Sequence, residues 1–363
     1  MKRKKRSHKT DYMSKKMDKK LGQIEDTLTA LYANTSYEVN AEFGKFMKQY
    51  AAKDEAMRAL VESGEKTQEE YIAWRNRQIL QQSKYKATVD KLTNMLVNTD
   101  KAAMAIVNGQ LPQVVAESYN FVKSLGFAAA KKSGLTEGTF QVYNARTVQG
   151  LIKKRPDLLP KPRVDIPKDM KWNKDRITRE LTQGILKGDS IPKIADRLQR
   201  VTDMDKNSAI RNARTAMTGA ENMGRSEAAE DMRKNGVPVK EVWSAKIDAR
   251  TRDTHLLLDG TYKDENGYFG VGIIDTPLRF AGDPAGDPEE VYNCRCRTSI
   301  ELEGIDHSQD GALYEDFMKE NYPEDYKALK ESTAQQEKAL EHKKTLEYQE
   351  VLKAINKQGY YVP

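Results

Sequence analysis

The chain has 363 residues, of which 32% are charged and 38% are hydrophobic, and its net charge is +7. This hydrophobic share allows a buried core, and at about 150 residues per domain the length suggests two or three folded units. No apolar run approaches the ~18 residues that a membrane-spanning helix needs, so we expect no membrane contact. The two cysteines, Cys294 and Cys296, are too few for a disulfide framework and favour a reducing compartment such as a cytoplasm.

Positive charge is concentrated in the first twenty residues, which hold ten Lys or Arg against two Asp. Such a segment has little apolar surface to bury, so we predict a disordered basic arm over residues 1–20. The arm could serve only solubility, but a polyanion would be attracted to it by counterion release. We favour nucleic-acid contact through Lys2, Arg3, Lys4, Lys5, Arg6, Lys9, Lys15, Lys16, Lys19 and Lys20.

Residues 21–150 are predicted to be mainly helical, because glycine and proline are sparse and apolar side chains recur three or four positions apart. Residues 108–109 and 111–112 predict a break, with a new helix beginning at Pro112. We find no catalytic cluster in this segment and interpret it as a helical interaction domain. The basic segment 151–170 is predicted to be an extended linker because of its prolines, Pro156, Pro160, Pro162 and Pro167.

Three helices and two strands are predicted within residues 171–302. Ile177, Leu181 and Ile185 form a helical stripe that Gly188 would end, and a second helix would follow from Ser190. A third helix, at about 205–234, presents small alanine side chains on one face. Val239–Lys246 and Val291–Leu302 are predicted strands, separated by loops with a turn at residues 264–267.

The acidic segment 303–363 is predicted to be a helical tail. The fold class expected from these elements is α+β. It comprises a mainly helical N-terminal region, a domain of helices with a small irregular sheet, and the helical tail.

One of the four histidines, His255, belongs to the same predicted domain as both cysteines. Side chains alternate along a strand, so Cys294 and Cys296 would share one face and could bind zinc together with His255 and a carboxylate such as Asp248 or Asp259. Two alternatives are a buried pair of cysteines beside a locally hydrogen-bonded histidine, which the spacing slightly favours, and a catalytic Cys–His pair. The candidate metal ligands are His255, Cys294, Cys296 and Asp248, with zinc as the candidate ion.

Four arginines surround this cluster in the sequence. They could bind phosphates, but nearby aspartates make salt-bridged loops the stronger prediction for Arg250, Arg252, Arg295 and Arg297. The chain contains no P-loop, no G-x-S-x-G elbow and no H-E-x-x-H helix. The common nucleotide-binding, serine-hydrolase and zinc-protease classes therefore lack their motifs.

Residues from about Asp165 to Leu302 resemble the phage head morphogenesis family, the minor head proteins similar to protein F of phage Mu. The matching motifs are GILKGDSIPKIADRL, NARTAMTGAENMGRSEAA, VWSAKIDARTRDTHLLLDG and NCRCR. The resemblance implies a virion protein in the capsid interior near the portal, assembled in the host cytoplasm. It also implies roles in head assembly and in handling packaged double-stranded DNA.

The partners implied are the portal protein, a major capsid or scaffolding protein, and DNA, and no enzyme activity is implied. Relatives in some prophages carry an ADP-ribosyltransferase after this domain, but the residues after Leu302 are too few for one. The main alternative is a metal- or thiol-dependent hydrolase or nuclease acting through His255 and Cys294. A further alternative is a host DNA-binding protein without a virion role, whose affinity would fall with salt.

Overall fold

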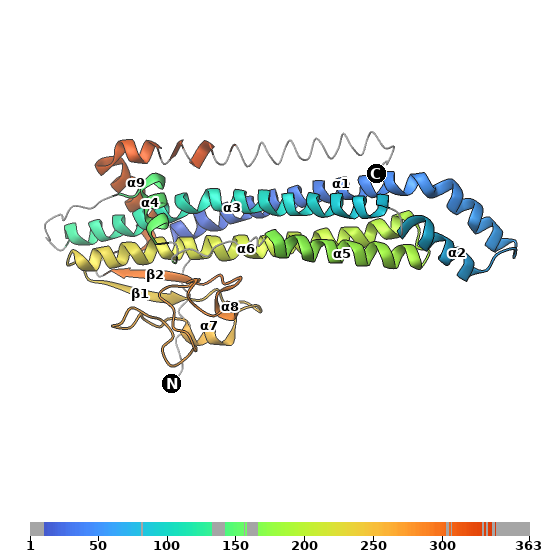
Figure 1. The fold of residues 1–363 in the computed structure, drawn as a ribbon. Coiled ribbons are helices and arrows are strands. Elements are labelled where there is room, and N and C mark those ends of the chain that lie inside the picture. The colour runs from blue at the N-terminus through green and yellow to red at the C-terminus, as the bar shows by residue number, and fades with distance from the viewer. Residues whose placement is uncertain are drawn as a thin grey trace. The chain divides into compact units, whose positions relative to one another are not determined.

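The computed structural model describes residues 11–80, 83–132, 142–155, 157, 166–302, 305, 307–328, 330–331, 333–335 and 338 (Figure 1). Three helices are long: α1 (Tyr12–Glu62), α3 (Ser83–Lys132) and α6 (Ile191–Lys234). The shorter helices are α2 (Gln68–Arg75), α4 (Ala145–Lys154), α5 (Ile166–Leu186), α7 (Asp253–Leu258), α8 (Pro288–Val291) and α9 (Asp310–Asn321). A π-helical segment spans Asn76–Leu80 and a 3-10 turn spans His307–Gln309.

The sheet in the described residues has two antiparallel strands, β1 (Val239–Ser244) and β2 (Arg297–Leu302). Val239 pairs with Leu302 at one end, and Ser244 pairs with Arg297 at the other. The predicted mainly helical α+β class is confirmed. Among the helices described, none combines the length and apolar character required to cross a membrane.

The chain folds into two compact units that do not follow the predicted order of domains. Within the described residues, unit 1 is drawn from residues 11–25, 106–157 and 211–338, and unit 2 from residues 26–105 and 166–210. The predicted division into a helical domain at 21–150 and a second domain at 171–302 is therefore wrong. The reason is that α1, α3 and α6 are each long enough to contribute to both units.

Two predicted helix boundaries are also wrong. α3 continues through Pro112, and α6 is one helix where two were predicted. A proline inside a helix removes one backbone hydrogen bond, but tertiary packing of an apolar face contributes more to helix stability than local propensity does. The residues flanking Pro112 supply that packing, since Leu111 and Val114 are buried.

The ends of the predicted linker at 151–170 are helical. α4 continues to Lys154 and α5 begins at Ile166. Apart from Arg155 and Asp157, the residues between these helices lie outside the described part of the chain. In the predicted tail, α9 confirms helix at Asp310–Asn321, and residues 341–363 also lie outside the described part.

Unit 2 contains the stripe predicted for α5. Ile177, Leu181 and Ile185 are fully buried in a core shared with residues of α1, α3 and α6. α5 ends at the predicted glycine, where Gly188 adopts a φ of +70° and the Asp189 N–H donates to the Gly184 carbonyl, 2.9 Å away. This left-handed turn satisfies carbonyl groups that the end of a helix leaves unpaired.

Unit 2 also buries a carboxylate without a hydrogen-bond partner. The Oδ2 atom of Asp205, on α6, has no donor within the described residues, and burial together with the charges of Asp100 and Asp169 raises the pKa of Asp205 to about 8. Asp100 accepts a hydrogen bond of 2.6 Å from the Tyr32 hydroxyl, and its own pKa is also raised, mainly by burial. The folded protein therefore holds a proton at neutral pH that the unfolded chain releases.

We expect unit 2 to lose stability as pH rises from about 4 to about 8, because over this window Asp205 is ionised in the unfolded chain and protonated in the folded one. Asp205→Asn should flatten this dependence and add roughly 1–3 kcal/mol at pH 8. Thermal melting between pH 4 and 9 measures the effect. The matched control is Asp196→Asn, an exposed position on the same helix, and equal pH profiles for both variants would contradict the prediction.

In unit 1, α3 and α6 approach each other closely through small residues. Ala213, Ala216 and Ala220 are buried, as the predicted alanine face requires. Gly224 continues this face, and a Cβ atom there would lie 2.5 Å from the Val115 carbonyl oxygen and 3.0 Å from the Ser118 Cβ. Only glycine allows this helix contact.

We expect Gly224→Ala to destabilise unit 1 by roughly 1–3 kcal/mol, because two helix backbones would have to separate to admit one methyl group. Gly109→Ala on α3 is the control. A Cβ atom there meets nothing within 4 Å, so helix propensity should make this variant up to about 1 kcal/mol more stable. Denaturant unfolding distinguishes the two, and equal stability of both variants would refute the close contact.

The sheet of unit 1 lies along α6 (Figure 1), where the side chain of Asn222 connects the two elements. Its Nδ2 atom donates to the carbonyls of Ala281 and Cys296, at 2.9 and 3.1 Å, and its Oδ1 atom accepts from the Thr298 N–H at 2.8 Å. Asn222 is fully buried. One amide side chain thus fixes the start of β2 against the helix.

Candidate metal centre

The three predicted ligands His255, Cys294 and Cys296 come together in unit 1. His255 Nδ1 lies 3.2 Å from the Cys296 sulfur and 3.7 Å from the Cys294 sulfur, and the three ligand atoms are within 4.8 Å of one another. All three side chains are at least 98% buried. The cluster could hold a metal ion, and it is the one group of this kind among the described residues.

The cysteines lie on a loop segment. They were predicted to lie on a strand, but that strand is shorter than predicted. β2 begins at Arg297, and α8 occupies the start of the predicted strand. Asn293 adopts a positive φ of 57°, and its N–H donates to Thr215 of α6, while Thr218 donates to the Cys294 carbonyl. The prediction that both cysteines face one way holds, but α6 and this turn cause it.

The surrounding core is apolar and aromatic. The ring centroid of Trp243, on β1, lies 5.2 Å from that of His255 and 5.5 Å from that of Phe269, and both pairs are edge-on. Leu258 and Val291 complete the packing around the cysteines. His255 lies on α7, which follows β1, so the cluster joins the loop after β1 to the segment before β2.

The two thiols have different protonation states. A hydrogen bond from Cys294 lowers the pKa of Cys296 to about 5, with a further contribution from His255. The pKa of Cys294 is raised by the same hydrogen bond and by burial. The lowered pKa favours the thiolate of Cys296, which is the form that binds metals.

A carboxylate is placed on the far side of the histidine ring. Glu290 Oε2 lies 2.9 Å from His255 Nε2, at ion-pairing distance although not aligned as a hydrogen bond, and it accepts a hydrogen bond from Thr254. Metal-bound histidines usually have such an outer carboxylate, which orients the ring so that the other nitrogen faces the ion. Glu290 was not among the predicted site residues, because no pattern in the sequence distinguishes it from its acidic neighbours.

The donor set fits zinc. A tetrahedral zinc ion with bonds of about 2.0–2.3 Å separates its ligand atoms by about 3.5 Å, close to the two nitrogen–sulfur distances here. One imidazole and two sulfurs are ligands that zinc prefers. They leave a fourth position open.

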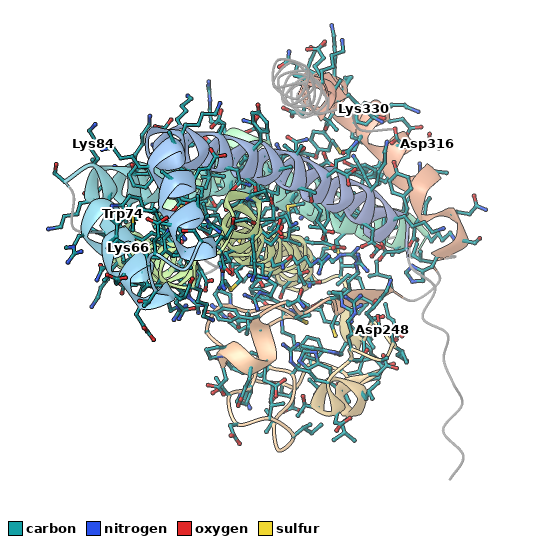
Figure 2. The ribbon with its side chains drawn as sticks, turned by 90° about the vertical axis from the view of Figure 1, so that its right-hand side faces the viewer. Lys66, Trp74, Lys84, Asp248, Asp316 and Lys330 are labelled. Atoms are coloured by element: carbon teal, nitrogen blue, oxygen red, sulfur yellow. The ribbon has the colours of Figure 1, made fainter. Side chains whose placement is uncertain are left out.

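The prediction of Asp248 as a metal ligand is wrong. Its carboxylate is held by the guanidinium of Arg295, with one hydrogen bond of 2.8 Å and a second, shorter one. Arg295 is also the main reason that the pKa of Asp248 lies well below its usual range. Asp248 lies on the loop after β1 (Figure 2). The other carboxylate considered, Asp259, accepts a hydrogen bond from the Ala245 N–H.

The prediction of a disordered arm over residues 1–20 is wrong from Tyr12 onward, because α1 begins there and buries Met13 and Met17. Lys16 pairs with the buried Glu117 at 2.5 Å. Burial raises the pKa of Glu117, but the charges of Lys16 and Lys20 outweigh it and the net shift is downward.

Lys16 and Lys20 therefore serve the fold, since they neutralise Glu117, and Lys20 is itself buried. Lys15 and Lys19 are exposed on α1. The remaining candidates for nucleic-acid contact, Lys2, Arg3, Lys4, Lys5, Arg6 and Lys9, lie outside the described residues.

The prediction that the arginines near the cluster form salt bridges with nearby aspartates is confirmed for Arg295, which pairs with Asp248. Arg297 pairs instead with Asp18 of α1 and Glu221 of α6. Arg252 donates to the Tyr292 carbonyl. The guanidinium of Arg250 makes no ion pair within the described part of the chain, so this arginine does not follow the prediction.

Comparison with known proteins agrees with this architecture. Residues 175–299 match the family described as Phage Mu protein F like protein. Minor head protein GP7 of Bacillus phage SPP1 is 25% identical over 301 residues, which cover 80% of this chain and 86% of that protein. NAD(+)--arginine ADP-ribosyltransferase EFV of Enterococcus faecalis is 29% identical over 135 residues, which cover 36% of this chain and only 26% of that enzyme. No solved structure matches the chain.

These matches support the phage head morphogenesis family, the one that the sequence motifs resemble. They support a minor head protein of a tailed phage.

Proposed function

We propose that the chain is a minor head protein that lies inside the phage head next to the portal, and that it acts in head assembly and in handling packaged double-stranded DNA. The observation that carries this proposal is the similarity to the SPP1 minor head protein over most of both chains. The expected partners are the portal protein, the major capsid or scaffolding protein, and DNA. Assembly would take place in the host cytoplasm.

Two experiments test this proposal. Mature particles of the phage are isolated and their proteins are identified by mass spectrometry, and the purified chain is sedimented together with portal rings. We expect the chain in particles in fewer copies than the capsid protein, and in the ring pellet. Absence from both would refute the proposed function. Presence in particles without binding to rings would refute only the place at the portal.

The metal part of the proposal is a structural zinc ion held by His255, Cys294 and Cys296. When bound, zinc would supply a cross-link between the loop after β1 and the segment before β2. Both segments have little regular structure of their own, and small loop-rich regions commonly depend on such a link. A structural role also suits a cluster whose ligands have almost no contact with solvent.

A thiol hydrolase or nuclease is the second candidate, and one observation favours it. Cys296, His255 and Glu290 form a chain of thiolate, imidazole and carboxylate, the order found in thiol enzymes. The structure makes Cys296, rather than the predicted Cys294, the nearer partner of His255. Burial of the sulfur opposes this role, because a substrate could not reach it.

The two candidates differ in what Cys296→Ala should do. An enzyme would lose activity on DNA or protein substrates while keeping its fold, whereas a structural site would lose zinc and thermal stability. Activity in the wild-type chain that disappears in this variant without a change in melting temperature would establish the enzyme.

A further inference from the structure

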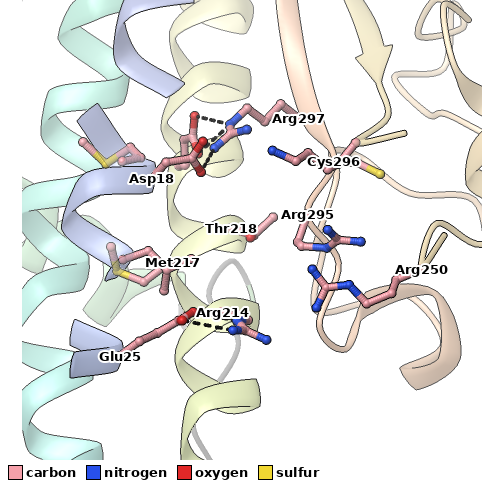
Figure 3. A pocket seen from close by; sticks show the side chains of 13 residues that line it. Asp18, Glu25, Arg214, Met217, Thr218, Arg250, Arg295, Cys296 and Arg297 are labelled. Carbon is pink, nitrogen blue, oxygen red and sulfur yellow. Dashed lines mark hydrogen bonds and ion pairs between the residues drawn. The ribbon is translucent and has the colours of Figure 1, made fainter. Parts of the chain in front are cut away.

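Unit 1 contains a cavity of about 210 Å³ on the side of the Cys294–Arg297 segment that faces away from the cysteine sulfurs (Figure 3). Its walls come from α1, α6, the loop after β1 and the start of β2. The cationic side chains that line it are Arg214, Lys246, Arg250, Arg295 and Arg297. We call it the arginine pocket.

The pocket follows from the alternation of residues in the NCRCR motif. Cys294 and Cys296 face His255, and Arg295 and Arg297 between and after them line the pocket. In Figure 3 the Cys296 sulfur points away from Thr218 of α6. Side chains alternate along an extended segment, so the cysteine and arginine side chains leave it in different directions.

Three of the five cations are neutralised by fixed acidic partners. Arg214 binds Glu25 through two hydrogen bonds of 2.6 and 3.0 Å. Arg295 binds Asp248, and Arg297 binds Asp18 and Glu221. These pairs hold their guanidiniums in place, so they are preorganised to bind an anion.

Two cations have no such partner. Lys246 and Arg250 are exposed, and neither side chain makes an ion pair or hydrogen bond within the described residues. Arg250 and Arg295 both act on the carboxylate of Asp248, which offsets one of their two positive charges. The second of these charges and that of Lys246 remain for a bound anion to neutralise.

We propose that the arginine pocket binds a phosphate group of a nucleic-acid backbone, with Arg250 and Lys246 as the cations that the phosphate neutralises. A carboxylate has two oxygens and is satisfied by one guanidinium. A phosphate presents more acceptor oxygens and therefore suits a site where several guanidinium groups and an ammonium group converge.

The apolar part of the pocket favours a phosphate that carries a sugar. Met17, Leu21 and Met217 also line it, and of these Leu21 is only half-buried. A deoxyribose ring would cover the exposed part of Leu21, which free inorganic phosphate would leave in contact with water. This inference rests on the proposed role in DNA handling and assigns it cations other than the ten basic residues at positions 2–20.

The test is duplex binding by Arg250→Gln/Lys246→Gln, two exposed changes that should not disturb folding. The six basic residues at positions 2–9 are changed to Gln in every protein, so that they cannot mask the pocket. We expect about tenfold weaker binding of a fluorescent 30-base-pair duplex, and a salt dependence of log K that is lower by about 1–2. Lys240→Gln, an exposed lysine outside the pocket, should bind as the parent does.

Calorimetry with inorganic phosphate identifies the source of the ligand. If the parent binds inorganic phosphate but not the duplex, and the double variant binds neither, the pocket is a phosphate site whose ligand is the free ion and not a nucleic-acid backbone. Duplex binding equal in the parent and the double variant, without phosphate binding, would overturn the inference. Polyglutamate is the test for an acidic peptide. If the parent binds polyglutamate as tightly as the duplex, and the double variant weakens both equally, the pocket binds acidic peptides and the inference is overturned.

Particle incorporation separates this inference from the proposed function. A double variant that enters particles normally and binds the duplex as the parent does would refute the pocket and leave the minor head assignment intact. Conversely, a wild-type chain absent from particles would refute that assignment, whatever the pocket binds.

Discussion

Removal of zinc should unfold the loops around Trp243. We expect purified protein to contain one zinc per chain, and a chelator to lower the melting temperature by roughly 5–10 °C, the equivalent of several kcal/mol. The physical reason is that His255, Cys294 and Cys296 link two loop segments, and that without the ion a thiolate remains buried at the cluster. Cys294→Ser should lose the metal and show the same fall in melting temperature without chelator.

The control is Ser299→Ala, a half-buried residue on β2 outside the cluster, which should keep its zinc. Elemental analysis and thermal melting of all three proteins decide the matter. If the wild type contains no metal and the chelator changes nothing, the cysteines and the histidine are ordinary core residues and the zinc proposal fails.

The second large effect is expected at Arg225, which is fully buried on α6. Its guanidinium donates to Asp11 at 2.7 and 2.9 Å, to Glu221 at 3.0 Å and to Ser14 at 3.1 Å. Arg225→Met removes the positive charge and leaves Asp11 without its cation, while Glu221 keeps Arg297. Breaking one side of a buried ion network costs about 3–5 kcal/mol, so the melting temperature should fall by roughly 10 °C.

Arg200→Met, an exposed arginine on the same helix, is the control and should change stability by less than about 0.5 kcal/mol. Adding Asp11→Asn to Arg225→Met should recover part of the loss, because the carboxylate that lost its cation is then neutral. Equal melting temperatures for the Arg225 and Arg200 variants would show that the network does not stabilise unit 1.

The network also determines how unit 1 responds to acid. Burial raises the pKa of Asp11, but Arg225 outweighs it and holds this pKa well below its usual range. The stability that this pair contributes is therefore present above about pH 4 and is lost as pH falls further. The wild type should show this loss in acid melting curves, and Arg225→Met should not.

Local patterns predict those parts of the fold that depend on neighbours in the sequence. The Ile177, Leu181 and Ile185 stripe, the stop at Gly188 and the strand containing Trp243 are of this kind. α3 is different, because whether it breaks at Pro112 depends on side chains from distant segments that pack against it. Periodicity does not contain that information.

The candidate site shows the same division. Sequence chemistry identifies His255, Cys294 and Cys296, since their residue types are common zinc ligands. Sequence chemistry cannot predict which nearby carboxylate lies at the site. Asp248 and Glu290 differ only in the partner that the fold places beside each of them, Arg295 for Asp248 and His255 for Glu290. In the same way, nothing in residues 1–20 indicates that Lys16 and Lys20 interact with a buried glutamate, Glu117, which lies 101 and 97 positions further along the chain.

The discontinuity of unit 1 has a consequence for how the protein is made. Asp11 and Arg225 are 214 positions apart, and the third stretch of unit 1 starts at Arg211. During synthesis the first turns of α1 leave the ribosome long before the helix that buries them exists. Folding of unit 1 must therefore wait for most of the chain, and contacts this distant in sequence close slowly. A nascent or truncated chain that ends before α6 would expose Met13 and Met17 to whatever chaperone or neighbour it meets first.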